Sequence, residues 1–148
     1  MDYRGLLNLS KSKQKGTAWE TECVRFLQSY IKREFMRLPL TGTKDVGDIR
    51  CLDLPEFVFE CKNRKDALSS LSEIMKETEQ ERLNAEADFA AALVKRRNFG
   101  TGGAYVVMEL HNFAQLIKER MYGKTNQTEN RNTIRKYPDD VKPMVEGT

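Results

Sequence analysis

Between Thr17 and Arg33, apolar residues recur every three or four positions, which is the spacing of an amphipathic helix: Trp19, Cys23, Phe26, Leu27, Tyr30 and Ile31. The run from Thr17 to Glu20 has the form of a capping box, in which a hydroxyl and a carboxylate close the first turn of a helix. The pattern therefore predicts a helix that begins at Thr17 and ends near Arg33.

Short apolar runs farther along the chain predict strands near Phe35–Leu38, Gly47–Leu52, Glu56–Lys62, Ala90–Lys95 and Ala104–Leu110. Two further helices are expected, one over Ser69–Ala87 and one that follows His111. The order helix, three strands, helix, two strands, helix predicts an α/β fold with a mixed β-sheet flanked by helices.

The two ends of the chain lack this apolar patterning. Residues 1–15 are polar and basic, and we expect them to form a flexible arm. Residues 122–148 are polar, poor in aromatic residues and interrupted by Pro138 and Pro143, so a mobile tail is expected there. The patterned part, residues 16–121, is then one folded domain.

Composition narrows the class of protein. The chain of 148 residues has 39% hydrophobic and 32% charged residues, as expected of one globular domain. No apolar run approaches the roughly 20 residues that span a bilayer, and the N-terminus lacks a signal-peptide core, so we expect a cytoplasmic protein without a membrane segment. The three cysteines lie in apolar patterns, which favours buried reduced thiols.

Charge is distributed unevenly. The net charge of +3 is too small to argue for a nucleic-acid partner. Basic residues nevertheless cluster in three places, at 11–15, 62–65 and 95–97, whereas acidic residues collect between Glu73 and Glu86. Positive clusters beside carboxylates suit a metal-dependent enzyme that acts on phosphates. The alternative is the solvated surface of a protein of mixed charge.

The strongest chemical signal lies at the end of the strand that contains Glu60 and Lys62. Side chains alternate along a strand, so these two project from one face and Cys61 from the other. A buried carboxylate and ammonium must pair or hold an ion. With Asp48 on the neighbouring strand, the pattern predicts a site for Mg²⁺ or Mn²⁺, to which the main-chain carbonyl of Cys61 could add a ligand. A chance combination of surface carboxylates and an ion pair is the alternative.

Three short motifs occur in order: a helix start from Lys15 to Glu20, then Gly47-Asp48-Ile49, then Phe59-Glu60-Cys61-Lys62. Together they resemble the PD-(D/E)xK nuclease superfamily, in particular the archaeal-type Holliday junction resolvases and their bacteriophage relatives. The resemblance covers about residues 15–118 and implies a restriction-endonuclease-like fold with an αβββαβ core, so that residues 16–121 are a nuclease domain. It further implies a homodimeric, metal-dependent endonuclease that cuts branched DNA in recombination or repair, in the host cytoplasm if a phage encodes it.

The resemblance also implies roles for individual residues. Asp48, Glu60 and the Cys61 carbonyl would hold Mg²⁺, for which Mn²⁺ would substitute, and Lys62 would be the catalytic lysine. Glu20 would reach the metal directly or through water, although it could equally serve only the capping box. The candidates for DNA contact are Lys11, Lys13, Lys15, Thr41, Thr43, Lys44, Arg64, Lys65 and Lys95.

Other readings remain open at this point. The Pro-Asp part of the superfamily motif is absent, since Val46-Gly47 precedes Asp48. The chain could be a nuclease of the same superfamily that acts on duplexes, flaps or ends, or a non-catalytic DNA-binding protein of the same fold. An unrelated α/β binding protein is a further alternative. Gln80 is expected on a solvent-exposed helix face and His111 at a helix start.

Overall fold

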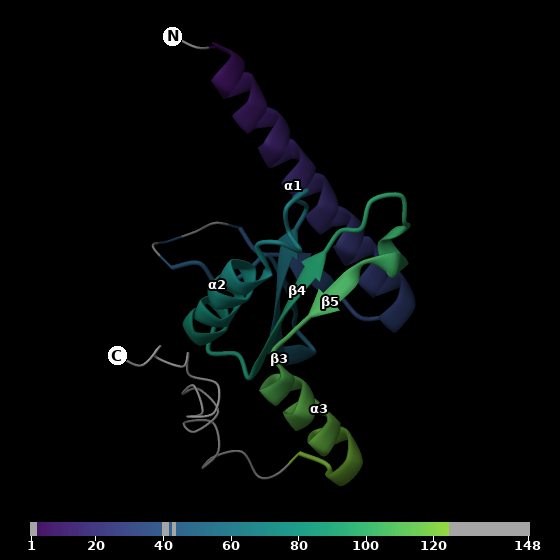
Figure 1. Ribbon diagram of the computed structural model, residues 1–148. Helices are drawn as coiled ribbons and strands as arrows, with labels where there is room; N and C mark the ends of the chain where they lie inside the picture. The colour runs from purple at the N-terminus through teal and green to yellow at the C-terminus, as the bar shows by residue number, and fades with distance from the viewer. Residues whose placement is uncertain (1–2, 40–41, 43, 125–148) are drawn as a thin grey trace, which may run out of the picture. The chain divides into compact units, whose positions relative to one another are not determined.

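The computed structural model describes residues 3–39, 42 and 44–124, with side chains from residue 11 onward. It divides into a unit up to Met108 and a unit from Glu109, and each is described by itself. The first unit contains α1 (Tyr3–Ile31), β1 (Phe35–Arg37), β2 (Ile49–Cys51), β3 (Leu54–Lys62), α2 (Leu71–Asn84), β4 (Phe89–Val94), the 3₁₀ turn η1 (Thr101–Gly103) and β5 (Tyr105–Val107) (Figure 1). The second contains α3 (Leu110–Tyr122).

The sheet has five strands in the order β1-β2-β3-β4-β5. Only β3 and β4 are parallel, and α2 makes the crossover between them, whereas the other neighbours are antiparallel. The predicted element order and the predicted α/β class with a mixed sheet are therefore confirmed. Element ends differ from the prediction by a few residues, most of all at β5, which is preceded by η1 and ends before α3.

The first helix corrects the sequence prediction. It begins at Tyr3 rather than Thr17, so residues 3–15 are helical and Thr17 lies in mid-helix. The capping box predicted there is consequently absent. Residues 11–15 are exposed on every side of the helix. A search for an apolar stripe misses such a segment, although lysine and glutamine favour a helix through their intrinsic propensity. The tail predicted at 122–148 lies, beyond Lys124, outside the described residues.

Two helices cover opposite faces of the sheet. On one face, Trp19 and Cys23 of α1 pack with Phe35, Ile49 and Leu93, and the Trp19 indole donates a hydrogen bond to the Leu93 carbonyl (3.0 Å). On the other face, Ile74 of α2 packs on Ala92 and Val94. All six residues of β4 are buried because the strand is covered on both faces. The three cysteines are free thiols, as predicted.

Gly47 sets the entry into β2. Its φ is +90°, and a Cβ there would lie 2.5 Å from Val58 Cγ2 and 3.3 Å from the Phe59 carbonyl oxygen. A side chain is therefore excluded by both the backbone conformation and the contact with β3. The next residue, Asp48, donates its N–H to the Phe59 carbonyl (2.9 Å), so the close approach of Gly47 places Asp48 directly beside β3.

We expect Gly47→Ala to destabilise the fold by about 2–5 kcal/mol, since it adds a left-handed backbone penalty to overpacking against Val58. Gly16→Ala is the matched control, because nothing lies within 4 Å of the added methyl group in mid-helix. That variant should gain about 0.5–1 kcal/mol. Urea unfolding followed by circular dichroism measures both, and equal midpoints for Gly47→Ala and the wild type would disprove the packing account.

Among the described helices, none is long and apolar enough to cross a membrane.

Candidate active site

Asp48 is held against the end of β3. Its Oδ2 accepts a hydrogen bond from the main-chain N–H of Cys61 (2.8 Å), and its own carbonyl accepts one from the N–H of Leu38 (2.7 Å). Asp48 thus links the end of β3 to the segment that follows β1. The carboxylate lies next to Glu60 in space although twelve residues separate them in sequence.

Glu60 and Lys62 project from the same face of β3, as predicted, toward α2. Lys62 Nζ lies 2.9 Å from Glu60 Oε1 and 3.0 Å from Glu77 Oε2 on α2. The Glu60 side chain is only 8% exposed and that of Lys62 is 16% exposed. The lysine is therefore held in place between two carboxylates at the rim of the sheet.

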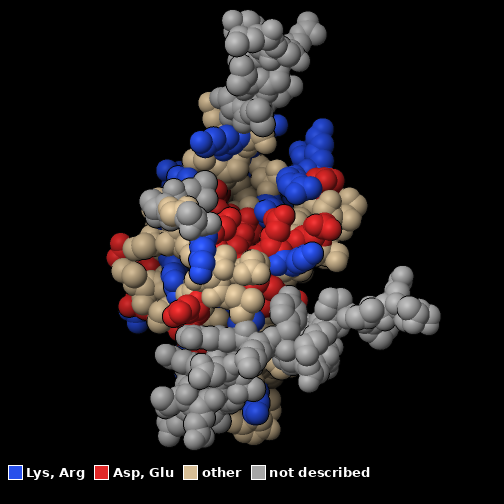
Figure 2. Space-filling model, turned by 90° about the vertical axis from the view of Figure 1, so that its left-hand side faces the viewer, with Lys and Arg blue, Asp and Glu red and all other residues tan. Residues whose placement is uncertain are grey.

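This end of the sheet opens into a pocket of about 430 Å³ on the α2 side. Its lining includes the acidic residues Asp45, Glu60, Glu73, Glu77 and Glu81 together with Lys62 and Lys76. Figure 2 shows this face, on which acidic side chains gather in the middle and lysine and arginine lie around them. The arrangement concentrates negative charge where the predicted cation would bind.

The crowding of carboxylates changes their protonation. Burial raises the pKa of Asp48 to about 7, and the nearby Glu60 carboxylate adds to the rise. Burial and Glu60 likewise raise the pKa of Glu81 to about 10. Although burial acts in the opposite direction, Glu60 and Glu77 raise the pKa of Lys62 above its ordinary value. Near neutral pH Lys62 is thus an ammonium ion, and the cluster carries more carboxyl groups than this one cation neutralises.

Glu60 Oε2 is the buried atom of the site whose hydrogen-bonding capacity is unsatisfied. It is buried and has no hydrogen-bond partner among the described residues. Asp48 and Glu81 could supply a donor to this oxygen only in their protonated forms, which their burial and the nearby Glu60 carboxylate favour by raising the pKa of each. A hard divalent cation would satisfy this oxygen and relieve the repulsion without protonation. The residues present therefore fit such an ion, with Asp48, Glu60 and the Cys61 carbonyl as available oxygen ligands.

The described residues contain no ready-made cluster of three or more His, Cys, Asp and Glu side chains arranged to hold a metal. The fit rests on two carboxylates and a main-chain oxygen instead. Oxygen ligands of this kind suit Mg²⁺, which keeps several waters and is bound by only one or two carboxylates.

Glu20 lies on α1 and approaches the site from the other side of Asp48. It forms an ion pair with Arg37 (2.8 Å) and has a 20% exposed side chain. Burial raises the pKa of Glu20, and the Asp48 carboxylate adds to this while Arg37 opposes it. Asp48 thus acts on the charge of Glu20, but in this structure the partner of Glu20 is Arg37.

Sequence reasoning missed two residues of the site, Glu77 and Glu81. They are four positions apart on α2 and so share a helix face, and Thr78 and Ile74 on the neighbouring positions are buried. Reading the acidic run as a solvated surface hid this face. Gln80 is exposed and donates a hydrogen bond to Asn84 (3.1 Å), and it also lines the pocket at the site, so it lies both at the surface and at the cleft. His111 is the second residue of α3.

The candidates for DNA contact fall into two groups around the site. Lys11, Lys13 and Lys15 are exposed on α1, and the Lys15 carbonyl accepts a hydrogen bond from Asn63 (3.5 Å), the residue after the catalytic candidate Lys62. Lys44, Arg64 and Lys65 are also exposed, whereas Lys95 is half-buried. Thr41 and Thr43 lie outside the described residues.

Comparison with known proteins adds the decisive observation. A family model described as "Phage putative PDDEXK endonuclease" matches residues 11–144. The chain belongs to this family. A search of curated proteins and a search of solved structures each found no significant match.

Membership in the PDDEXK endonuclease family agrees with the fold, a mixed sheet with α1 and α2 on its two faces. It confirms the predicted nuclease superfamily and its phage-type relatives, and it makes DNA the substrate class. PDDEXK nucleases generally use divalent metal ions, and the acidic site at the end of β3 fits one.

Proposed function

We propose that this PDDEXK endonuclease is a Mg²⁺-dependent, structure-selective enzyme that cuts branched DNA, foremost four-way Holliday junctions, with Asp48, Glu60, Lys62 and Glu20 in its active site. Mn²⁺ would substitute for Mg²⁺. The observation that carries the proposal is the buried Glu60 oxygen without a donor, placed between Asp48 and the ammonium group of Lys62. Carboxylates in excess of the neighbouring cation can hold a metal ion, and a fixed lysine beside them can contact the phosphate. A surface ion pair offers neither function in phosphodiester hydrolysis.

The metal would be held by Asp48, Glu60 and the Cys61 carbonyl. When bound there, it supplies Lewis-acid polarisation of the phosphate and a water with a lowered pKa. The chain contributes the ligands already in position, because the Cys61 N–H and the Gly47 turn fix Asp48 relative to β3. Glu20 would contact the metal through a water molecule after its ion pair with Arg37 breaks.

Lys62 has a separate task. Its ammonium group is fixed between Glu60 and Glu77, where it can donate a hydrogen bond to a phosphate oxygen or to the attacking water. In the proposed reaction, a water oxygen forms a bond to phosphorus and the bond from phosphorus to O3′ breaks. The water gives up a proton to solvent, the departing O3′ takes up a proton from solvent, and the products are a 5′-phosphate and a 3′-hydroxyl.

Basic side chains around the acidic centre would hold the DNA backbone. Lys11, Lys13 and Lys15 supply one row on α1, and Lys44, Arg64, Lys65 and Lys95 supply others. Thr41 and Thr43 are proposed for phosphate contacts in the loop before Asp48. Ionic contacts of this kind give affinity that falls steeply with salt.

The preference for branched DNA and a homodimeric state form the finer part of the proposal. They are supported by the three ordered motifs that resemble those of junction resolvases. A four-way junction also needs two coordinated cuts, and a two-fold symmetric enzyme supplies them.

A cleavage panel tests the proposal. End-labelled four-way junctions, flaps and linear duplexes of equal length are incubated with the enzyme and Mg²⁺, and sedimentation of the same sample gives the oligomeric state. We expect the junction to be cut at least about tenfold faster than the duplex, which corresponds to about 1.4 kcal/mol of selectivity. Equal rates on all substrates would make the protein a general nuclease, and binding without any cutting would make it a non-catalytic DNA-binding protein.

A further inference from the structure

A second pocket lies at the carboxyl ends of the two parallel strands. It has a volume of about 470 Å³ and is lined by residues 63–65, 67 and 68 after β3, by residues 94–99 at and after the end of β4, and by Tyr105. In α/β sheets, ligands bind preferentially at the carboxyl ends of parallel strands, because the connections there diverge and leave a crevice. Its position alone makes this pocket a candidate binding site.

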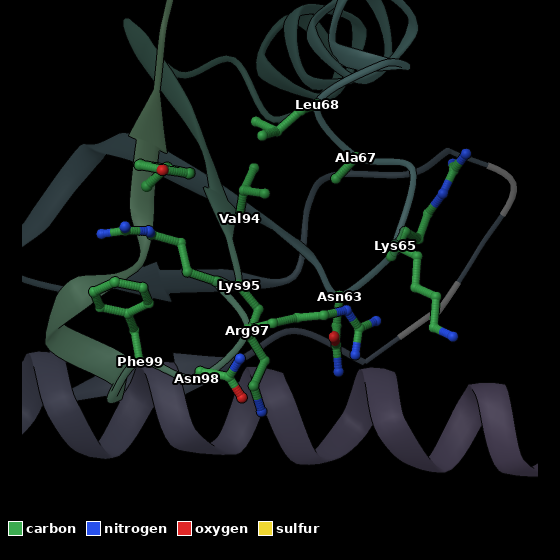
Figure 3. Close-up of a pocket in the computed structure, with 12 residues that line it drawn as sticks. Asn63, Lys65, Ala67, Leu68, Val94, Lys95, Arg97, Asn98 and Phe99 are labelled. Atoms are coloured by element: carbon green, nitrogen blue, oxygen red, sulfur yellow. The ribbon is translucent and has the colours of Figure 1, made fainter.

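The charge of this pocket is opposite to that of the acidic site. Its lining holds the basic residues Arg64, Lys65, Lys95, Arg96 and Arg97 and contains no aspartate or glutamate among the described residues. Figure 3 shows several of the side chains that line this pocket, among them Lys65, Lys95 and Arg97. A concave surface with five cations and no anion is suited to a polyanion.

Some of these cations already have partners. Arg64 pairs with Asp66 (2.8 Å), and Lys95 approaches Glu22 (3.5 Å) and lies over the Trp19 ring. Lys65 and Arg97, by contrast, have no ion-pair partner in the part of the chain that the structure describes. These two side chains are available to a phosphate without breaking an existing contact.

An aromatic platform borders the same pocket. The guanidinium of Arg96 lies 3.6 Å from the ring centroid of Phe99 and 4.6 Å from that of Tyr105, and it donates a hydrogen bond to the Gly103 carbonyl (3.2 Å). Phe99 also packs closely against Gly103, because a Cβ added at Gly103 would lie 3.2 Å from the Cβ of Phe99. Nevertheless Phe99 is 53% exposed and Tyr105 is 40% exposed. Aromatic rings held rigidly but left open to solvent inside a basic crevice have no role in the core.

Contacts to paired DNA need only the cations, since its bases are stacked inside the duplex. Sites for single strands combine a basic groove with aromatic rings on which unpaired bases stack. We propose that this pocket binds an unpaired nucleotide of the DNA strand next to the cut, with its base on Phe99 and its phosphate at Lys65 and Arg97. The proposal rests on the nuclease function proposed above and extends it to branched substrates that carry an unpaired nucleotide at the branch, such as flaps. A four-way junction, whose nucleotides are all paired, would present such a nucleotide only when a base pair at its branch point opens.

The pocket is placed to serve this purpose. Asn63 follows Lys62 directly, so its lining begins one residue beyond the catalytic candidate on the same chain. Lys62 and Val94 are register partners at the ends of β3 and β4, and the pocket extends from Val94 onward. A strand whose phosphate lies at Lys62 therefore has its neighbouring nucleotides within reach of the basic crevice.

Fluorescence anisotropy tests the proposal with the full-length protein in EDTA, so that no strand is cut. The probes are a labelled twelve-nucleotide oligothymidylate and a blunt duplex of the same length. We expect Phe99→Ala to weaken oligothymidylate binding by roughly 5- to 100-fold and duplex binding by less than about twofold. Phe99→Tyr keeps the ring and should restore binding, whereas Phe99→Leu should not. Tyr30→Ala removes an exposed aromatic ring outside the pocket and is the control.

Charge is tested by the salt dependence of the same binding. Arg97→Ala should lower the slope of log affinity against log salt by about 0.7 for the oligothymidylate, and Arg33→Ala, an exposed arginine outside the pocket, should not change it. Unchanged oligothymidylate affinity in Phe99→Ala, or an equal loss on both probes, would overturn the proposal. The binding assay does not require cleavage. An inactive enzyme in the cleavage panel would therefore refute the nuclease function, but it would not decide whether the pocket binds an unpaired nucleotide.

Discussion

Lys62→Ala is expected to reduce DNA cleavage by about 10³-fold or more while junction binding changes little. The side chain is fixed by Glu60 and Glu77 at the point where a scissile phosphate would lie, so its removal takes away charge stabilisation in the transition state. A loss of about 4 kcal/mol of such stabilisation corresponds to roughly 10³ in rate. Binding should persist because the other cations around the site contribute most of the affinity. Single-turnover cleavage and anisotropy on the same four-way junction measure the two effects.

Two further variants make this result specific. Lys62→Arg keeps a positive charge between Glu60 and Glu77. Thermal unfolding of both Lys62 variants checks that a loss of cleavage is not caused by a loss of folding. Arg33→Ala removes an exposed cation outside both pockets and should leave cleavage within about tenfold of wild type. A Lys62→Ala protein that folds and cuts at the wild-type rate would rule out the proposed role of this lysine.

Divalent cations are expected to stabilise the protein, and to do so more strongly as the pH rises. The pKa of Asp48 is raised from 3.8 to about 7, so between these values the folded state binds more protons than the unfolded state. Without metal, the contributions of Asp48 and Glu81 to stability are therefore most favourable below about pH 4. The contribution of Asp48 is lost as the pH rises toward 7, and that of Glu81 as it rises toward pH 10. A cation replaces the protons and reverses the loss.

Differential scanning calorimetry in EDTA and in Mg²⁺ from pH 5 to pH 8.5 measures this coupling. At a metal concentration about 100 times Kd, the gain is about 2.7 kcal/mol, which raises Tm by roughly 5–10 °C in a domain of this size. Asp48→Asn should be more stable than wild type in EDTA at pH 8 and should gain little from Mg²⁺. A wild-type Tm in EDTA that rises steadily over this pH range, with no effect of Mg²⁺, would contradict the electrostatic account.

The sheet and the central chemistry follow from local patterns in the sequence. The period of two along β3 places Glu60 and Lys62 on one face whatever the rest of the chain does. This alternation depends only on neighbouring residues, and for that reason the sequence predicts it. The positive φ of Gly47 was not predicted, because it depends on the contact with Val58 of another strand.

Features that depend on distant contacts were not predictable in the same way. Residues 11–15 of α1 include no apolar residue, so only their propensity signals that the helix continues through them. Glu77 and Glu81 belong to a run of charges whose inward face is defined by packing of α2 on β4. The basic pocket brings together segments about thirty residues apart that become neighbours because β3 and β4 are parallel. The ion pair of Glu20 with Arg37 also arises from tertiary packing.

The central claim is that Asp48 and Glu60 hold a divalent ion for DNA cleavage. Its most direct test compares wild type and Asp48→Asn on a labelled four-way junction, each in Mg²⁺ and in EDTA, with folding verified by circular dichroism. The account predicts cleavage by the wild type in Mg²⁺ alone, with 5′-phosphate ends, and none by the variant under either condition. Cleavage by wild type in EDTA, or by folded Asp48→Asn at the wild-type rate in Mg²⁺, would contradict it.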